Sequence, residues 1–174
     1  MQAVVNTKYG SPDVLQFMDV EKPTPKDDEV LIQVGAVSIN AYDWHLLSAD
    51  IPLVRLMGGG FLKPKITILG ADVAGRVESV GVNVKQFQAG DEVFGDIGSG
   101  GFAEYACATE KALALKPANL SFEEAAAVPM AALTALQGLR DNGHIQPGKK
   151  VLIQGASGGV GTFAVQIAKP LGLK

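Results

Sequence analysis

The pattern of apolar residues changes near residue 120, and this change constrains the fold more than any other feature. Before it, short β-branched segments are separated by turns rich in glycine, proline and acidic residues. These segments are AVVNT, VLQFMDV, DEVLIQVGAVSIN, ADVAGRVESVG, DEVFGD, GFAEYACATE and KALALKP. Short strands at such regular intervals are typical of an antiparallel barrel or sandwich. We therefore predict a β domain over residues 1–120.

The second part, residues 121–174, predicts α/β structure. Ser121 and Glu124 have the spacing of a capping box, and Pro129 should end or kink the first helical turns before MAALTALQGL continues as helix. KKVLIQG is an apolar run typical of a buried parallel strand, and GGVGTFAVQIAKPLG then opens another helix. The expected fold class is mixed β and α/β, with a domain boundary near residue 120.

Three glycine-rich stretches compete as phosphate-binding loops, and their contexts separate them. GDIGSGGFAEY (95–105) joins two predicted strands without a helix start, so we expect a hairpin turn. LMGGGF (56–61) is typical of a loop, with a lid over a pocket as the alternative. VLIQGASGGVG (151–161) differs because it follows a predicted strand and opens a helix. An ordinary strand-to-helix turn remains the alternative for this third stretch.

The third stretch contains an A-x-G-x-x-G version of the dinucleotide-binding fingerprint. Its residues are Ala156, Ser157, Gly158, Gly159, Val160 and Gly161. Gly158 would let the backbone approach a pyrophosphate, and Gly161 would let helix and strand pack closely. Ala156 can serve at the tight turn if its φ stays negative. The sequence therefore predicts a dinucleotide site at this helix start.

Composition excludes several other classes of protein. Hydrophobic residues make up 47% of the chain and charged residues 19%, which fits a soluble globular protein rather than a disordered one. We see neither a secretory signal nor an apolar run long enough for a membrane span. Cys107 is the only cysteine, so an internal disulfide is excluded and a cytoplasmic location is expected. The net charge of −3 and the scattered basic residues argue against nucleic-acid binding.

Five stretches follow one another in an order that resembles a known family. They are SINAYDWHL, ILGADVAGRVESVGVNVKQFQAGDEVFG, GGFAEYACA, SFEEAAAVPMAALTALQGL and VLIQGASGGVG. With them the chain resembles the medium-chain dehydrogenase/reductase superfamily, and within it the zinc-independent quinone oxidoreductases of the zeta-crystallin type. The resemblance implies a GroES-like β-barrel domain followed by the first strand and helix of an incomplete Rossmann fold. It also implies reduction of quinones, enones or related activated carbonyl compounds with NADPH, NADH not being excluded.

The resemblance further implies that no metal takes part. In the zinc-dependent branch, a cysteine begins the stretch matching NAYDWH, a histidine follows the glycine matching Gly70, and a second cysteine precedes the helix matching LTALQGL. Those positions hold Asn40, Ala71 and Ala131 in this chain, and none of these is a zinc ligand. We therefore expect hydride transfer without metal.

Residue roles follow from the same resemblance. Asn40, Tyr42, Asp43 and His45 would lie where the hydride passes to substrate, and Thr134 would meet the cofactor near its nicotinamide end. Asn40 could donate a hydrogen bond to the substrate carbonyl oxygen. Tyr42, His45 and solvent are alternative proton donors. Asp43 could act in the chemistry or cap backbone amides.

A Rossmann domain needs two mononucleotide-binding halves, and only the first strand and helix are expected here. The residue that selects NAD or NADP should come about 20 residues after the loop, beyond Lys174. We therefore expect the chain to be the N-terminal portion of a longer homodimeric reductase with a small-molecule substrate, and to be inactive alone. The alternative is a GroES-like module that binds or assembles without catalysis.

Overall fold

The computed structural model describes residues 1–55 and 60–173 and divides into two compact units, Met1–Ala127 and Val128–Lys174. The expected loop at LMGGGF therefore lies largely outside the described residues. Each unit is considered by itself below. None of the described helices is both long and apolar enough to cross a membrane.

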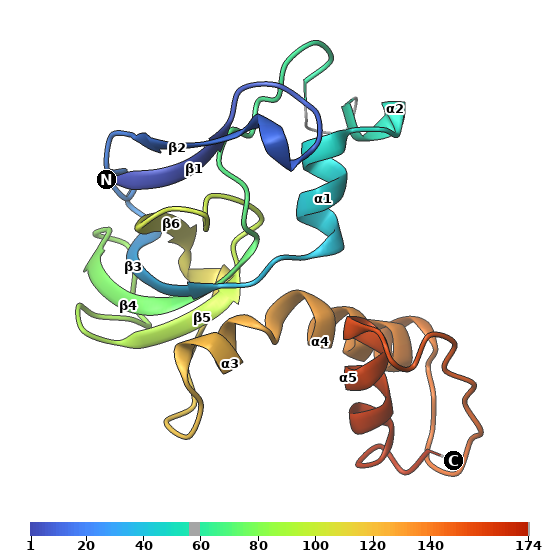
Figure 1. Cartoon of the computed structure of the whole chain (residues 1–174). Coiled ribbons are helices and arrows are strands. Elements are labelled where there is room, and N and C mark those ends of the chain that lie inside the picture. Colours follow the sequence, from blue (N-terminus) through green and yellow to red (C-terminus); the bar gives the residue numbers. More distant parts are fainter. Residues whose placement is uncertain (56–59, 174) are drawn as a thin grey trace. The chain divides into compact units, whose positions relative to one another are not determined.

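The first unit is built on two antiparallel sheets (Figure 1). A two-stranded ribbon pairs β1 (Gln2–Asn6) with β2 (Leu15–Asp19). A five-stranded sheet has the order β6-β3-β4-β5-β7. Its strands are β3 (Glu29–Val37), β4 (Asp72–Val80), β5 (Glu92–Asp96), β6 (Tyr105–Thr109) and β7 (Leu113–Leu115). The short helices of this unit are η1 (Pro12–Val14), α1 (Ala41–Ser48), α2 (Pro52–Val54), η3 (Glu110–Ala112) and α3 (Phe122–Ala126).

β-Branched side chains on one face of this sheet form the core. Val30 and Ile32 of β3 are completely buried, as are Val73 of β4 and Val93 of β5. They pack in one cluster with Phe87 and other apolar residues. Because strand side chains alternate between faces, residues two apart meet in the interior. The seven strands expected within residues 1–120 all form, and the mixed fold class is confirmed.

The hairpin expected at residues 95–105 does not form; these residues are the loop between β5 and β6. β5 and β6 are not neighbours in the sheet, because β3 and β4 lie between them. The backbone N–H groups of Gly100, Gly101 and Phe102 instead donate to the carbonyls of residues 68, 70 and 69, at 2.9 Å in each case. Strands that follow one another in sequence need not pair, and here the preceding segment satisfies the loop's backbone groups.

The unit boundary follows Ala127, further along than the residue 120 expected from sequence. The capping box forms as expected: Glu124 N donates to Ser121 Oγ at 3.1 Å, and Ser121 N donates to Glu124 Oε2 at 2.8 Å. The helix that it starts, α3, buries Ala125 and Ala126 against Ala74 of β4. Because α3 packs on the sheet, it belongs to the first unit.

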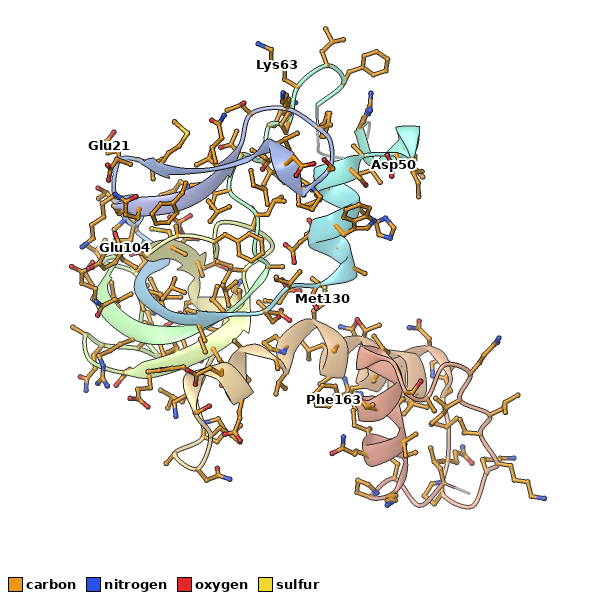
Figure 2. The ribbon with its side chains drawn as sticks, in the orientation of Figure 1. Glu21, Asp50, Lys63, Glu104, Met130 and Phe163 are labelled. Atoms are coloured by element: carbon orange, nitrogen blue, oxygen red, sulfur yellow. The ribbon has the colours of Figure 1, made fainter. Side chains whose placement is uncertain are left out.

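The second unit is helical. Pro129 occupies the first turn of α4 (Pro129–Leu136), where its missing N–H costs nothing. The chain continues as a π-helical segment, η4 (Gln137–Asn142), and later as α5 (Gly159–Ala168). Ala135, Leu139 and Ala164 form its buried cluster, against which Phe163 of α5 packs (Figure 2).

The strand expected at KKVLIQG does not form. Residues 151–153 carry no strand pairing, and the side chain of Leu152 is 94% exposed. A parallel strand needs a hydrogen-bonded neighbour, and the described part of this unit consists otherwise of helices and turns. Local apolarity therefore fails to produce a strand where no partner strand is available.

Candidate functional site

The start of α1 holds the first group of predicted site residues. Asn40 is the N-cap of the helix, and Asp43 lies in its first turn with only 3% of its surface exposed. Asp43 Oδ2 accepts from Asn40 N at 2.9 Å, and Oδ1 accepts from Gly70 N at 2.8 Å. Asp43 thus ties the helix start to the residues that precede β4. The sequence left two roles open for Asp43, capping of backbone amides and participation in the chemistry. The contacts are those of a cap, and a chemical role stays a prediction.

The side chain of Asn40 is held by two polar neighbours. Its Nδ2 lies 3.1 Å from Ser38 Oγ and 3.2 Å from Asp72 Oδ2. Ser38 Oγ also donates to Asp72 Oδ2 at 3.4 Å. The predicted hydrogen bond from Asn40 to a substrate carbonyl would therefore compete with these two acceptors.

Asp72 is the member of this group that sequence reasoning missed. Its side chain is completely buried at the first residue of β4. The local pattern gave no signal for it, because Asp72 shares its alternation along β4 with Arg76 and Glu78, which are exposed.

Tyr42 and His45, the alternative proton donors, lie on the exposed side of α1. Tyr42 is 40% exposed, and partial burial raises the pKa of its hydroxyl above the usual value, with Asp96 and Asp43 adding to the effect. The hydroxyl is protonated at neutral pH, and the raised pKa makes it a weaker acid than an ordinary tyrosine. His45 is exposed. Which of them donates a proton stays a prediction.

The glycine loop at the start of α5 holds the second group. Gly158 is the N-cap, its N–H donates to Gly155 O at 3.0 Å, and its carbonyl accepts from Thr162 N at 2.9 Å. Gly155 adopts a φ of 73°, a left-handed conformation that favours glycine. The predicted cofactor residues Ala156, Ser157, Gly158, Gly159 and Val160 are all exposed. A helix start presents N–H groups that have no partner within the helix, and these can bind an anion.

Close packing explains the last glycine of the fingerprint. A Cβ on Gly161 would lie 2.1 Å from Gly155 O and 2.7 Å from Ala156 Cα, so no larger residue fits without movement. By contrast, a Cβ on Gly158 would approach Gly155 O only to 3.4 Å, and one on Gly159 would meet nothing within 4 Å. The loop is therefore packed on its Gly161 side and open at Gly158 and Gly159.

Thr134 belongs to the same unit as the glycine loop. It is exposed on α4, next to Ala135, which packs with Ala164 of α5. The two groups of predicted residues consequently lie in different units, Asn40 to His45 in the first and Thr134 with the loop in the second.

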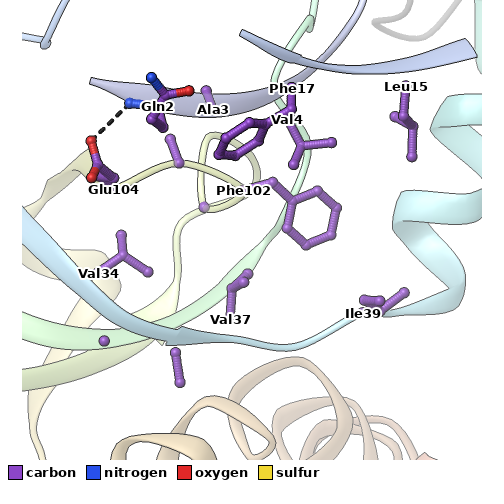
Figure 3. A pocket seen from close by; sticks show the side chains of 14 residues that line it. Gln2, Ala3, Val4, Leu15, Phe17, Val34, Val37, Ile39, Phe102 and Glu104 are labelled. Atoms are coloured by element: carbon purple, nitrogen blue, oxygen red, sulfur yellow. Dashed lines mark hydrogen bonds between the residues drawn. The ribbon is translucent and has the colours of Figure 1, made fainter. Parts of the chain in front are cut away.

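A pocket of about 570 Å³ lies in the first unit and was not foreseen (Figure 3). Apolar side chains dominate its lining, and Gln2 N donates to Glu104 Oε2 at 2.7 Å beside it. The lining comes from β1, β2, the end of β3 and the loop before β6, so no local pattern could have indicated it. It includes none of the predicted site residues; its lining residues are Gln2, Ala3, Val4, Leu15, Phe17, Val34, Gly35, Ala36, Val37, Ile39, Gly101, Phe102, Ala103 and Glu104.

Two further kinds of reactive group bear on catalysis, metal-ligating clusters and the cysteine thiol. Over residues 1–55 and 60–173, no cluster of three or more His, Cys, Asp or Glu side chains could hold a metal ion. Cys107 is half-buried on β6, and burial raises the pKa of its thiol to about 11. The thiol therefore stays protonated at neutral pH and is a weak nucleophile.

Comparison with known proteins identifies the family. Residues 26–118 match the model of the alcohol dehydrogenase GroES-like domain, and the chain belongs to this family. It is 41% identical to a quinone oxidoreductase of Sus scrofa over 177 residues, which covers all of this chain and 51% of that protein. It is likewise 41% identical to a 2-methylene-furan-3-one reductase of Solanum lycopersicum over 179 residues, covering 97% of this chain and 44% of the relative. The chain spans about half the length of these relatives.

Solved structures agree with this assignment. The CurK enoyl reductase matches with a TM-score of 0.91 and 34% identity, over 99% of this chain and 52% of that one. The Escherichia coli quinone oxidoreductase, crystallised as a complex with NADPH, matches with a TM-score of 0.86 and 33% identity, over 100% of this chain and 51% of that one. The resemblance to quinone oxidoreductases inferred from sequence is thereby confirmed.

Proposed function

We propose that this chain is the substrate-side and first cofactor-binding part of an NADPH-dependent reductase that transfers hydride to quinones, enones or related activated carbonyl compounds without metal. The observation that carries the proposal is the open glycine loop at the start of α5. Relatives named quinone oxidoreductase and 2-methylene-furan-3-one reductase support the substrate class, and the E. coli relative was crystallised with NADPH.

The residues of the loop fit a dinucleotide pyrophosphate. The N–H groups of Gly159, Val160 and Gly161 belong to the first turn of α5, where the helix dipole also favours an anion. Ser157 adds an exposed hydroxyl, and Gly158 has no side chain to obstruct the approach of the phosphates. When bound, the nicotinamide supplies the hydride. Thr134 would contact the cofactor nearer to that end.

The residues at the start of α1 would serve the substrate. Reduction of a quinone by NADPH consumes one proton and yields NADP⁺ and the hydroquinone, so a proton must reach the substrate oxygen. Tyr42, His45 and solvent are alternative donors, and the raised pKa of the Tyr42 hydroxyl makes it a weaker acid than an ordinary tyrosine. Asn40 would orient the substrate, and Asp43 would hold the helix start in place through its two amide contacts.

A glycine substitution tests the proposal. Gly158→Ala introduces a Cβ at ordinary contact distance from Gly155 O, 3.4 Å, so the loop should fold while the methyl group obstructs the phosphates. We expect NADPH affinity, measured by isothermal titration calorimetry on the 174-residue chain, to fall at least ~10-fold, equivalent to about 1.4 kcal/mol. Gly138→Ala, whose Cβ would meet nothing within 4 Å, is the control and should bind as the original chain does.

Measurement of quinone reduction is the second part of the test of the proposed function. NADPH oxidation with 1,4-benzoquinone should be followed for the 174-residue chain and for a longer polypeptide that contains it. If the longer polypeptide neither binds NADPH nor reduces quinone, the reductase proposal fails.

The second candidate, a GroES-like binding or assembly module, would then be favoured by the exposed apolar side chains of the second unit, of which Leu152 is the most exposed.

A further inference from the structure

We propose that Asp72 is a positioning residue, which fixes the side-chain amide of Asn40 at the start of α1. Neither Asp72 nor its partner Ser38 was among the predicted site residues. The functional consequence rests on the proposed reductase activity, whereas the positioning itself can be measured without any turnover.

The position of Asp72 is fixed by its surroundings. It is completely buried, it begins β4, and it pairs in register with Asp96 of β5. Its backbone carbonyl accepts from Ser38 N at 3.1 Å, which attaches the segment after β3 to the same point. Burying a carboxylate costs several kcal/mol unless hydrogen bonds compensate it, so its contacts are expected to persist.

Asp72 also determines how the side-chain amide of Asn40 is oriented. Asp72 Oδ2 accepts from both Ser38 Oγ and Asn40 Nδ2, so the carboxyl group meets Asn40 at its NH₂ group and not at its amide oxygen. The Nδ2···Oδ2 distance of 3.2 Å and the Ser38 contact at 3.1 Å agree with that orientation.

The backbone of Asn40 is held by a different residue, Asp43. Asp43 accepts from Asn40 N at 2.9 Å and from Gly70 N at 2.8 Å. Two buried carboxylates therefore hold the same residue, Asp43 at its main chain and Asp72 at its side chain. With both ends held, the amide is oriented before any substrate arrives, which is the condition for accurate positioning in a functional site.

The test uses the side-chain amide protons of Asn40 in the ¹⁵N-labelled 174-residue chain. In the original chain these protons should exchange with water at least ~10-fold more slowly than those of exposed Asn119, because exchange requires the hydrogen bonds to open. Asp72→Ala should remove most of this difference. Asp91→Ala, which deletes a carboxylate at the opposite end of β5 that accepts from Gln88 N, should leave it intact.

Two results would overturn the proposal. One is equal exchange of Asn40 and Asn119 in the original chain, a measurement that does not depend on any variant folding. The other is a folded Asp72→Ala chain in which Asn40 remains as protected as before. In an active reductase, Asp72→Ala should lower kcat for quinone reduction at least ~10-fold, about 1.4 kcal/mol, with an unchanged Kd for NADPH. A parent protein without NADPH binding or turnover would refute the proposed function but leave the exchange result to stand.

Discussion

The two units contain similarly apolar stretches but bury them very differently. In the first, Val30, Ile32, Val73 and Val93 are completely buried between strands that pair with one another. In the second, the buried cluster is small, and Leu152 is 94% exposed in a stretch that reads as a strand. Strand β3 finds its partners β4 and β6 within the first unit, although they lie far along the chain, whereas residues 151–153 have no partner strand in the described part of the second unit. The difference shows that an apolar sequence pattern produces a strand only where the chain also supplies a partner strand for it to pair with.

The predicted site residues differ between the units in the same way. Around Asn40, two buried carboxyl groups hold one residue, Asp43 at its backbone N–H and Asp72 at its side-chain amide. Around Gly158, the small residues leave open space at the start of α5. The proposed roles differ accordingly: the first region would orient a reacting molecule and the second would bind a phosphate.

Ile32→Ala should have the largest effect on stability. Because Ile32 is completely buried in the sheet core, truncation removes buried methyl groups and leaves a cavity. We expect the free energy of unfolding of the first unit to fall by about 2–5 kcal/mol. Urea titration followed by the fluorescence of Trp44, the only tryptophan, measures it. Val82→Ala, at a residue 85% exposed, is the control and should change little. Equal effects of both variants would show that the sheet core is not the stabilising feature.

Gly161→Ala should be the most damaging small change in the second unit. Its Cβ would lie 2.1 Å from Gly155 O, a backbone atom that cannot rotate away. We expect a loss of about 1–3 kcal/mol in local stability from overpacking, measured by hydrogen exchange of the α5 amides. Gly159→Ala, with no atom within 4 Å of its Cβ, should exchange as the original chain does. Unchanged protection in Gly161→Ala would mean that the loop is too loosely packed to hold a cofactor.

Ser121→Ala tests whether α3 belongs energetically to the first unit. It removes the hydroxyl that accepts from Glu124 N at 3.1 Å. We expect the Trp44 unfolding transition to shift by about 1 kcal/mol, the usual cost of a lost N-cap. Thr109→Ala, at an N-cap whose side chain makes no capping hydrogen bond, is the matched control. A transition that moves no more for Ser121→Ala than for Thr109→Ala would contradict the boundary after Ala127.

Leu152→Ser should have the smallest effect in this chain. Because the side chain is almost fully exposed, we expect a change within about 0.5 kcal/mol, measured by hydrogen exchange of the second unit. In a longer polypeptide that supplies a neighbouring strand, the same substitution should be clearly destabilising. A large loss in the 174-residue chain itself would show that this stretch is already packed.

Much of this molecule could be predicted from local pattern. The strands around Val30 and Val73 follow from β-branched alternation, the start of α3 from Ser121 and Glu124, and the first residue of α4 from Pro129. The role of Gly161 in close packing also followed from its place in the fingerprint, and the distances agree with it. These features depend on residues a few positions apart, whose interactions are local.

The features that sequence reasoning missed all depend on distant segments meeting. Asp72 reaches Asn40 across 32 positions of sequence, and the pocket beside Val34 and Phe102 is assembled from four segments. The hairpin expected at residues 95–105 failed because β3 and β4 come between its two strands.

The sequence by itself determined the class of fold, the family, the glycine loop and the residues at the start of α1, because each is written in local composition or in an ordered set of motifs. The tertiary structure alone decided the strand order, the packing of α3 on the sheet, and the contacts of Asp72 and Asp43 with Asn40. It also decided that Leu152 stays exposed. The physical reason is that burial and hydrogen-bond pairing depend on which distant residues become neighbours, and local propensity does not specify these neighbours.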